Sequence, residues 1–292
     1  MKNHSDELIF QSQICAGASQ ICLMADEKPP ARISHRLFAT GRSEMRIRLK
    51  MEFTYKAYGE LLALLRQQGY TFSSYHNYQD CDRSVIIRHD IDMDIAKAVK
   101  MAEMEKEMGV SSTYFVLVTS HFYNIFAREN QDMLRKLHGM GHEIGLHFDE
   151  AKYGEETDMV LAMEQEAELL AQCMGVPVRS VSMHRPSRKT LEADYLVKGG
   201  QIVNSYGTEF FRNHKYVSDS RRNWREDVLA IIRSGEYDRL HVLTHAFWYD
   251  QTEQTAKEAL KAFCEGMTGR CYEWMQDNVR DLDEILKRSE LR

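Results

Sequence analysis

Two carboxylates that follow a buried apolar run are the strongest sign of chemistry in this sequence. The run from Val85 to Ile87 predicts a buried strand, which ends abruptly in charge at Asp90 and Asp92. In extended backbone these two residues lie on one face, about 6–7 Å apart. Two acids directed into one space repel each other, so each needs a cation or a proton nearby. A divalent metal beside a general base would satisfy both, whereas a helix cap at Asp92 or Asp94 is the plain alternative.

Histidines and acids also stand at the ends of several further apolar runs. Because the carboxyl ends of parallel strands meet at one edge of a sheet, we expect these side chains to converge. A single histidine at such a position is more often structural, but four of them with paired aspartates indicate a site. The groups are His89 with Asp90 and Asp92, His147 to Glu150, His184 with Arg185, Ser218 with Asp219, and Thr244 to Trp248.

The elements that must position these groups alternate between strand and helix patterns from Val85 to Thr244. Such alternation predicts a parallel sheet with helices outside it. About seven strands can be counted, which favours an α/β fold built as a distorted parallel (β/α) barrel. No glycine-rich phosphate loop follows any strand, so nucleotide binding has no support. The expected strands begin near Val85, Thr113, Glu143, Val178, Gln201, Lys215 and Leu240.

The composition is that of an ordinary globular protein, with 43% hydrophobic and 28% charged residues among 292. The net charge of −6 argues against a nucleic-acid-binding surface, and no apolar run is long enough for a membrane span. The six cysteines form no CxxC pair, so we expect reduced thiols and a cytoplasmic protein. Residues 1–50 lack apolar periodicity and are expected to be a mobile extension, with the barrel domain at residues 51–292.

The residue types at the strand ends suit metal-assisted hydrolysis of an amide or ester. One carboxylate and imidazoles can hold a divalent cation such as zinc, which polarises a carbonyl and activates water. A second carboxylate would take the proton of that water, and a histidine opposite would protonate the leaving group. Trp224 and Trp248 would offer apolar faces for a sugar ring.

The order of these motifs resembles the polysaccharide deacetylase superfamily, which comprises carbohydrate esterase family four and its relatives. The resemblance covers roughly Val85 to Trp248 and is greatest to a divergent branch found among surface-polysaccharide biosynthesis proteins. It implies a metal-dependent deacetylase, with zinc as the expected ion and an N-acetylated sugar or sugar-containing precursor as the substrate. The matching segments are Arg88–Asp92, Ser112–Phe115, Gly141–His147, Met183–Ser187, Tyr216–Ser220 and Leu243–Trp248.

The resemblance also implies roles for individual residues. Asp90 falls on the position of the base, and His245 falls on that of the general acid. Asp92 and His147 fall on metal-ligand positions. Arg185, in the arginine-proline motif, and Trp248 are expected to contact the substrate.

Two departures from the family pattern leave alternatives open. Ile91 separates two aspartates that are usually adjacent, so the roles of Asp90 and Asp92 could be exchanged. The second metal histidine is replaced by Ala151, which cannot bind a metal. His184 is the expected third ligand, with Asp149 and Glu150 as the next candidates.

Two further functions remain open from the sequence. A protein that kept this fold but lost catalysis would only bind its ligand, whereas a small-molecule carbon–nitrogen hydrolase would differ only in its substrate. We also expect His142 to be a surface or loop residue. The sequence does not determine the sugar, the acyl group or the oligomeric state.

Overall fold

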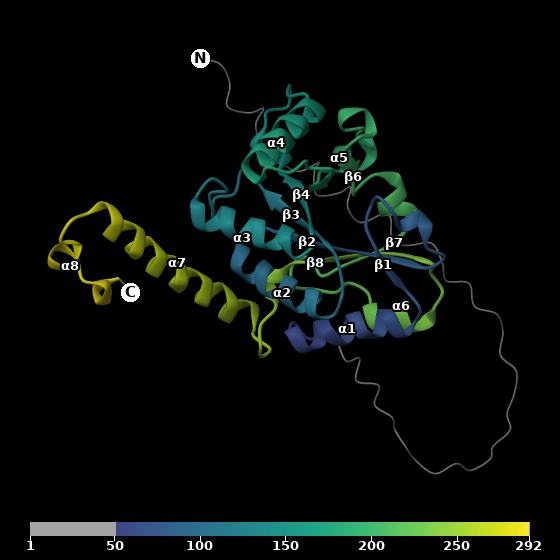
Figure 1. Ribbon diagram of the computed structural model, residues 1–292, viewed down its shortest axis with the longest axis horizontal. Helices are drawn as coiled ribbons and strands as arrows, with labels where there is room; N and C mark the ends of the chain where they lie inside the picture. The colour runs from purple at the N-terminus through teal and green to yellow at the C-terminus, as the bar shows by residue number, and fades with distance from the viewer. Residues whose placement is uncertain (1–50, 292) are drawn as a thin grey trace, which may run out of the picture. The chain divides into compact units, whose positions relative to one another are not determined.

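All of the motif-bearing strands belong to one parallel sheet (Figure 1). The computed structural model describes residues 51–291, and the extension expected at residues 1–50 lies outside these described residues. The strands are β1 (Thr71–Ser73), β2 (Ser84–Ile91), β3 (Thr113–Leu117), β4 (Glu143–Phe148), β5 (Ser180–Met183), β6 (Val203–Asn204), β7 (Lys215–Ser218) and β8 (Arg239–Thr244).

The strand order is β6-β5-β4-β3-β2-β8-β7, with the short strand β1 paired to the first residues of β2. Every ladder is parallel, which confirms the predicted distorted parallel barrel of about seven strands. The sequence did not predict β1, because a three-residue strand is too short to show alternation. The register places the two histidine-bearing strand ends of β2 and β8 side by side, with His89 opposite Thr244.

The strands β6 and β7 lie at the two ends of this path, and within the described chain they share no ladder. Aromatic contacts bridge this seam instead. Tyr206, just after β6, has its ring centroid 6.2 Å from that of Tyr216 on β7. Phe211 contacts both rings, at 5.2 and 5.0 Å. Neighbouring strands on this path are therefore joined by ladder hydrogen bonds, whereas β6 and β7 meet through aromatic side chains.

Helices that alternate with the strands flank the sheet, whereas α7 and α8 follow the last strand and project away from it (Figure 1). In the structure α2 packs on α3 and α1 packs on α6, as Figure 1 shows. Among residues 51–291 no helix has the combined length and apolar character of a membrane span. The helices are α1 (Tyr55–Gln67), α2 (Ile95–Glu107), α3 (Arg128–Gly139), α4 (Met159–Met174), α5 (Arg188–Ala193), α6 (Val228–Ser234), α7 (Ala256–Asn278) and α8 (Leu282–Ile285).

The helix that follows the first motif begins with a capped N-terminus. The side chain of Asp94 accepts a hydrogen bond from the Ala96 N–H, at 2.9 Å, and so satisfies a backbone donor that the helix leaves free. The capping alternative therefore holds for Asp94. Asp94, and not Asp92, is the N-cap residue of α2.

Strand β2 is buried along its whole length but presents different chemistry on its two faces. Alternate side chains point to opposite faces of a strand. Val85 and Ile87 pack into the main apolar core, whereas Ile86 joins a smaller cluster with Phe115. Arg88 and Asp90 continue the face of Ile86. This face carries the polar residues of the site.

Candidate metal and proton-transfer site

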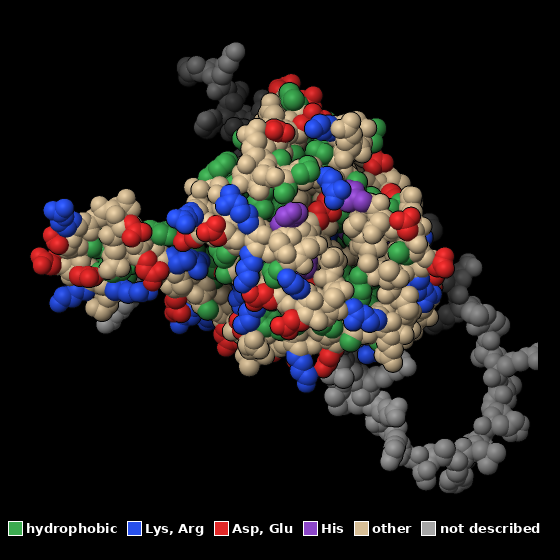
Figure 2. All heavy atoms as spheres, in the orientation of Figure 1, with side chains coloured by type: hydrophobic (Ala, Val, Ile, Leu, Met, Phe, Trp, Pro, Cys, Tyr) green, Lys and Arg blue, Asp and Glu red, His purple; other side chains and the backbone are tan. Residues whose placement is uncertain are grey.

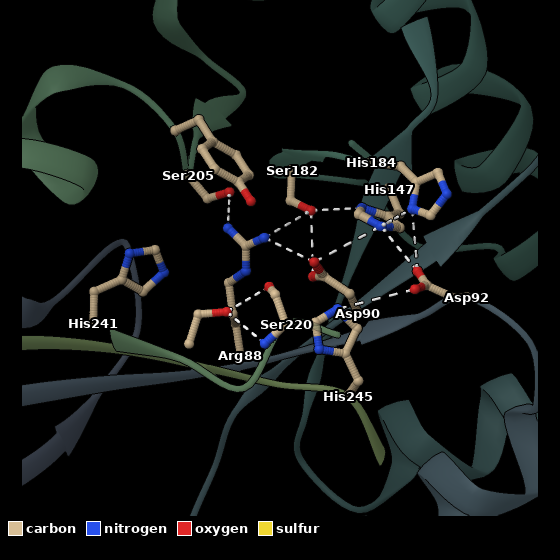
Figure 3. A network of polar contacts seen from close by, with 12 residues as sticks. Arg88, Asp90, Asp92, His147, Ser182, His184, Ser205, Ser220, His241 and His245 are labelled. Carbon is tan, nitrogen blue, oxygen red and sulfur yellow. Dashed lines mark hydrogen bonds and ion pairs between the residues drawn. The ribbon is translucent and has the colours of Figure 1, made fainter. Parts of the chain in front are cut away.

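Three predicted ligands converge at the carboxyl ends of neighbouring strands, as Figure 3 shows. His147 lies on β4, and Asp92 and His184 follow β2 and β5 directly. Asp92 Oδ1 is 3.2 Å from His147 Nε2 and 3.3 Å from His184 Nδ1. The two imidazole nitrogens are 3.1 Å apart. Each residue thus offers one ligand atom to the same point.

The residues present fit a divalent metal. Asp92 Oδ1 is buried and has no hydrogen-bond partner of suitable geometry among the described residues. Burial opposes ionisation, but His147 and His184 hold the pKa of Asp92 below its ordinary value. Ligands held at about 2.0–2.1 Å around a tetrahedral ion lie about 3.3–3.4 Å from one another, close to the separations observed. A carboxylate with two imidazoles is a donor set that zinc accepts.

A serine orients His147 toward this point. His147 Nδ1 is 2.7 Å from Ser182 Oγ, and Ser182 in turn donates to Asp90 Oδ1 at 3.4 Å. The serine hydroxyl therefore accepts from the Nδ1–H of His147. This arrangement leaves the Nε2 lone pair of His147 facing Asp92 and His184, as a metal ligand requires.

Asp90 is held as a carboxylate by an arginine two residues earlier on the same strand. Arg88 is fully buried and donates from Nη2 to Asp90 Oδ2 at 2.8 Å, and from Nη1 to Ser205 Oγ at 2.8 Å. Burial opposes ionisation of Asp90, but the Arg88 guanidinium keeps the pKa of this carboxyl below its ordinary value. Asp90 Oδ2 lies 3.7 Å from His147 Nε2, so an ionised base stands next to the three ligand atoms.

His245 faces the same point from β8 and is paired with a second buried acid. Its Nδ1 is 2.6 Å from Asp219 Oδ1, while its Nε2 lies 3.9 Å from Asp92 Oδ2. Asp219 is fully buried and also accepts from the His245 N–H and from the hydroxyl of Tyr249. Burial would lower the pKa of His245, but Asp219 outweighs it and raises that pKa to about 9. The imidazolium form suits a proton donor.

These groups line a cleft of about 670 Å³. Figure 2 shows histidine side chains reaching the surface on this face, with lysine or arginine side chains beside them. Trp248 and the mostly buried Trp224 supply apolar walls, and Arg185 lies at the mouth. The Arg185 guanidinium donates to Asp149 Oδ2 at 2.9 Å, and the arginine side chain is 69% exposed.

The structure brings all seven sequence-predicted site residues to this one cleft. The members are Asp90, Asp92, His147, His184, Arg185, His245 and Trp248. The two other candidate ligands are engaged elsewhere, since Asp149 pairs with Arg185 and Glu150 accepts from the backbone of Ser187. Ala151 is exposed in the turn after β4.

His142 lies in the loop before β4, as one of its two expected placements had it, but it is buried and not at the surface. This residue is 1% exposed, and its Nδ1 accepts from the Ser112 N–H at 3.2 Å. Its Nε2 faces the Ala102 carbonyl at 3.3 Å. The side chain of this loop residue turns inward under α2.

Sequence reasoning missed three residues that orient the site. Asp219 was noticed at a strand end without a role, Arg88 only as part of a motif, and Ser182 not at all. An acid at the end of the strand beside β8 could have suggested a partner for His245. The alternation of β2 could likewise have placed Arg88 on the face of Asp90.

No protein-family model and no curated protein matches this sequence. Solved structures that resemble it include a mutant of a carbohydrate esterase family 4 pseudoenzyme with restored enzymatic activity. That match has 16% identity and a TM-score of 0.40, and it covers 64% of this chain and 65% of that chain. The match thus spans slightly less than two thirds of that protein's length.

Two further solved structures resemble the chain at a similar level. A family 4 carbohydrate esterase from Bacillus anthracis has 16% identity over 72% of this chain and 85% of that chain, with a TM-score of 0.39. A polysaccharide deacetylase from Bacillus cereus has 15% identity over 64% of this chain and 88% of that chain, with a TM-score of 0.41. These proteins carry the family name that the sequence motifs suggested. All three TM-scores are below 0.5, so the chemistry proposed below stands on the residues of the site.

Proposed function

We propose that this chain is a metal-dependent hydrolase that removes an acyl group, such as acetyl, from an N-acetylated sugar or a precursor containing one. One observation carries the proposal. The ligand atoms of Asp92, His147 and His184 face one point, with the carboxylate of Asp90 and the imidazole of His245 both beside it. A metal, a base and an acid are the three components that metal-assisted amide hydrolysis uses.

The residues divide the reaction between them. When bound, a divalent ion such as zinc would polarise the acyl carbonyl and make water more acidic. Asp90, kept ionised by Arg88, accepts the proton that the attacking water gives up. His245, kept protonated by Asp219, donates a proton to the leaving nitrogen as the carbon–nitrogen bond breaks. The products are a carboxylic acid and a free amine.

The replacement of the usual second histidine by Ala151 raised the alternative of a binding protein without catalysis. The position of His184, 3.3 Å from Asp92, supports the hydrolase instead, because it supplies a third ligand from a different strand. Reduced cysteines support a cytoplasmic location as part of the proposal, since all four cysteines of the described chain are free thiols. A small-molecule amide substrate would use the same reacting residues and would differ from a sugar only in the part that contacts the cleft walls.

The test measures bound metal and released acetate on the same preparation. The full chain is loaded with zinc and incubated with N-acetylglucosamine, its oligomers and N-acetylated sugar phosphates. Acetate release is expected from at least one of them, and the His245→Ala variant should keep the metal but release far less. Stoichiometric metal without acetate release from any of these substrates would overturn the hydrolase in favour of a binding protein.

A further inference from the structure

Arginines gather at the mouth of the cleft. Arg221 and Arg225, in the loop between β7 and α6, line it together with Arg185 from the loop after β5. Arg221 and Arg225 are both exposed. Within residues 51–291 neither forms an ion pair, whereas Arg222 between them pairs with Glu253 at 2.6 Å. Two guanidinium groups thus face the cleft without a counter-charge from the described chain.

The acids that line the same cleft are already neutralised. Asp90 is paired with Arg88 at 2.8 Å, and Glu226 with Lys215 at 2.5 Å. Asp92 lies among the proposed metal ligands, where a bound divalent ion would offset its charge. The uncompensated charge of the cleft mouth is therefore positive, although the whole chain carries a formal net charge of −6.

The backbone holds two of the cleft arginines, and Arg222 beside one of them, in an unfavourable conformation. Arg185, Arg221 and Arg222 have φ angles of 49°, 59° and 54°, in the left-handed region that side chains other than glycine rarely adopt. Residues kept in this region gather at functional sites, where the surrounding structure imposes the strain. Half of the six non-glycine residues with positive φ in the described chain belong to these two loops.

Contacts on the far side of the loop fix its position. The Arg222 guanidinium lies 4.7 Å from the centre of the Phe53 ring, in addition to its pairing with Glu253. The Asn223 N–H donates to the carbonyl of Asp219, which closes the turn behind Arg221 at 3.0 Å. The turn that orients the proton donor His245 therefore also carries Arg221 to the cleft mouth.

We propose that the substrate carries an anionic group, a phosphate or a carboxylate, which Arg221 and Arg225 bind while the acylated nitrogen lies at the metal site. This inference rests on the proposed function. Guanidinium groups bind both kinds of anion through paired, charge-assisted hydrogen bonds. Trp248 lines the same cleft and offers an apolar wall for the sugar ring, which would lie between the anionic group and the acylated nitrogen.

The test measures binding without relying on turnover. Glucosamine 1-phosphate, glucosamine and glucuronic acid are titrated by calorimetry into the zinc-loaded full chain. At least one of the two anionic sugars should bind about tenfold or more tightly than glucosamine, and this advantage should shrink as salt is added. Comparing glucosamine 1-phosphate with glucuronic acid shows whether the site prefers a phosphate or a carboxylate.

The variant Arg221→Gln with Arg225→Gln should bring the affinity ratio between the anionic sugars and glucosamine close to one. Arg233→Gln is the matched control, because this arginine is exposed at the other end of α6 and does not line the cleft. Equal affinity for all three sugars in the wild type, or the same loss in the control, would overturn the inference. Anion-selective binding in this titration, together with no acetate release from the N-acetylated sugars of the activity test, would reject the hydrolase. The anion site at Arg221 and Arg225 would still stand.

Discussion

Strand β2 separates two buried clusters of charged side chains, one on each face. On the outer face the carboxylate of Glu105 on α2 is surrounded by donors. Tyr58 and His89 lie 2.6 and 2.9 Å from its Oε1, and Ser112 and Tyr114 lie 2.7 and 2.8 Å from its Oε2. Both oxygens are fully buried and fully paired.

On the inner face the polar groups are less completely paired. Asp92 Oδ1 and Arg88 Nε are buried without a hydrogen-bond partner among the described residues. Unpaired buried polar groups cost stability, so proteins retain few of them and often at functional sites. Complete pairing thus marks the Glu105 cluster as structural, and incomplete pairing marks the Asp92 cluster as a place for a ligand.

The largest effect is expected from Glu105→Ala. Removing this carboxylate leaves its buried donors without an acceptor, and breaking a buried ion pair costs about 3–5 kcal/mol of unfolding free energy. Asp92→Asn in metal-free protein is the comparison and should cost less, because Asp92 is partly exposed and loses only its ion pairs with the surrounding histidines. Denaturant unfolding measures both. Equal losses in the two variants would contradict the distinction between the clusters.

The pH dependence of stability should show the contribution of Glu105 directly. Burial opposes the charge of Glu105, but His89 and the other donors lower its pKa from 4.5 to about 2. Its contribution is therefore complete above about pH 4.5 and is lost as the pH falls toward 2. The Glu105→Gln variant should lack this part of the acid transition.

His147→Ala should abolish stoichiometric zinc binding. The variant loses a direct ligand, so its zinc affinity should fall by more than about a hundredfold, the upper end of what an outer-shell mutation costs. Competition with a chromogenic chelator gives the affinity. His142→Ala is the control, because that histidine belongs to the outer cluster and should leave zinc affinity unchanged. Full zinc occupancy in His147→Ala would refute the ligand assignment.

Asp90→Asn should reduce hydrolysis about a hundredfold or more while metal is retained, since a positioned proton-transfer group contributes at least that much. Acetate release and metal content are measured on one sample. An active Asp90→Asn enzyme, together with an Asp92→Asn protein that keeps its metal, would show that the two aspartates have exchanged roles.

The smallest effect is expected from Asp219→Asn. Activity requires protonated His245 and should decline above about pH 9 in the wild type. Asp219 raises the pKa of His245, so its neutralisation should move the alkaline limb of kcat/KM to lower pH. The loss should therefore be greater at pH 8 than at pH 6. An unmoved alkaline limb would assign that limb to another group.

The sequence predicted the parallel barrel and the positions of the strand-end residues because both follow from local patterns. The apolar runs identify the strands, and parallel pairing brings their ends together whatever the details of packing.

Pairing between distant residues was not predictable in this way. The partner of His89 is Glu105, sixteen positions later on α2, and nothing in the alternation of β2 indicates it. The burial of His142 was not predicted either, because it depends on the helix that covers this loop. Which arginine neutralises Asp90 likewise depends on packing, since Arg88 points inward and Arg185 remains at the cleft mouth.

The seam between β6 and β7 gives the cleft a wall made of aromatic side chains. Tyr206, Phe211 and Tyr216 join the two strands through ring contacts, and all three rings line the cleft. No ladder hydrogen bond in the described chain joins these two strands, whereas β2, β4 and β8, which carry the reacting groups, are held in register by ladders on both sides. The barrel thus fixes its reacting groups through the backbone and closes the opposite wall of the cleft through side chains.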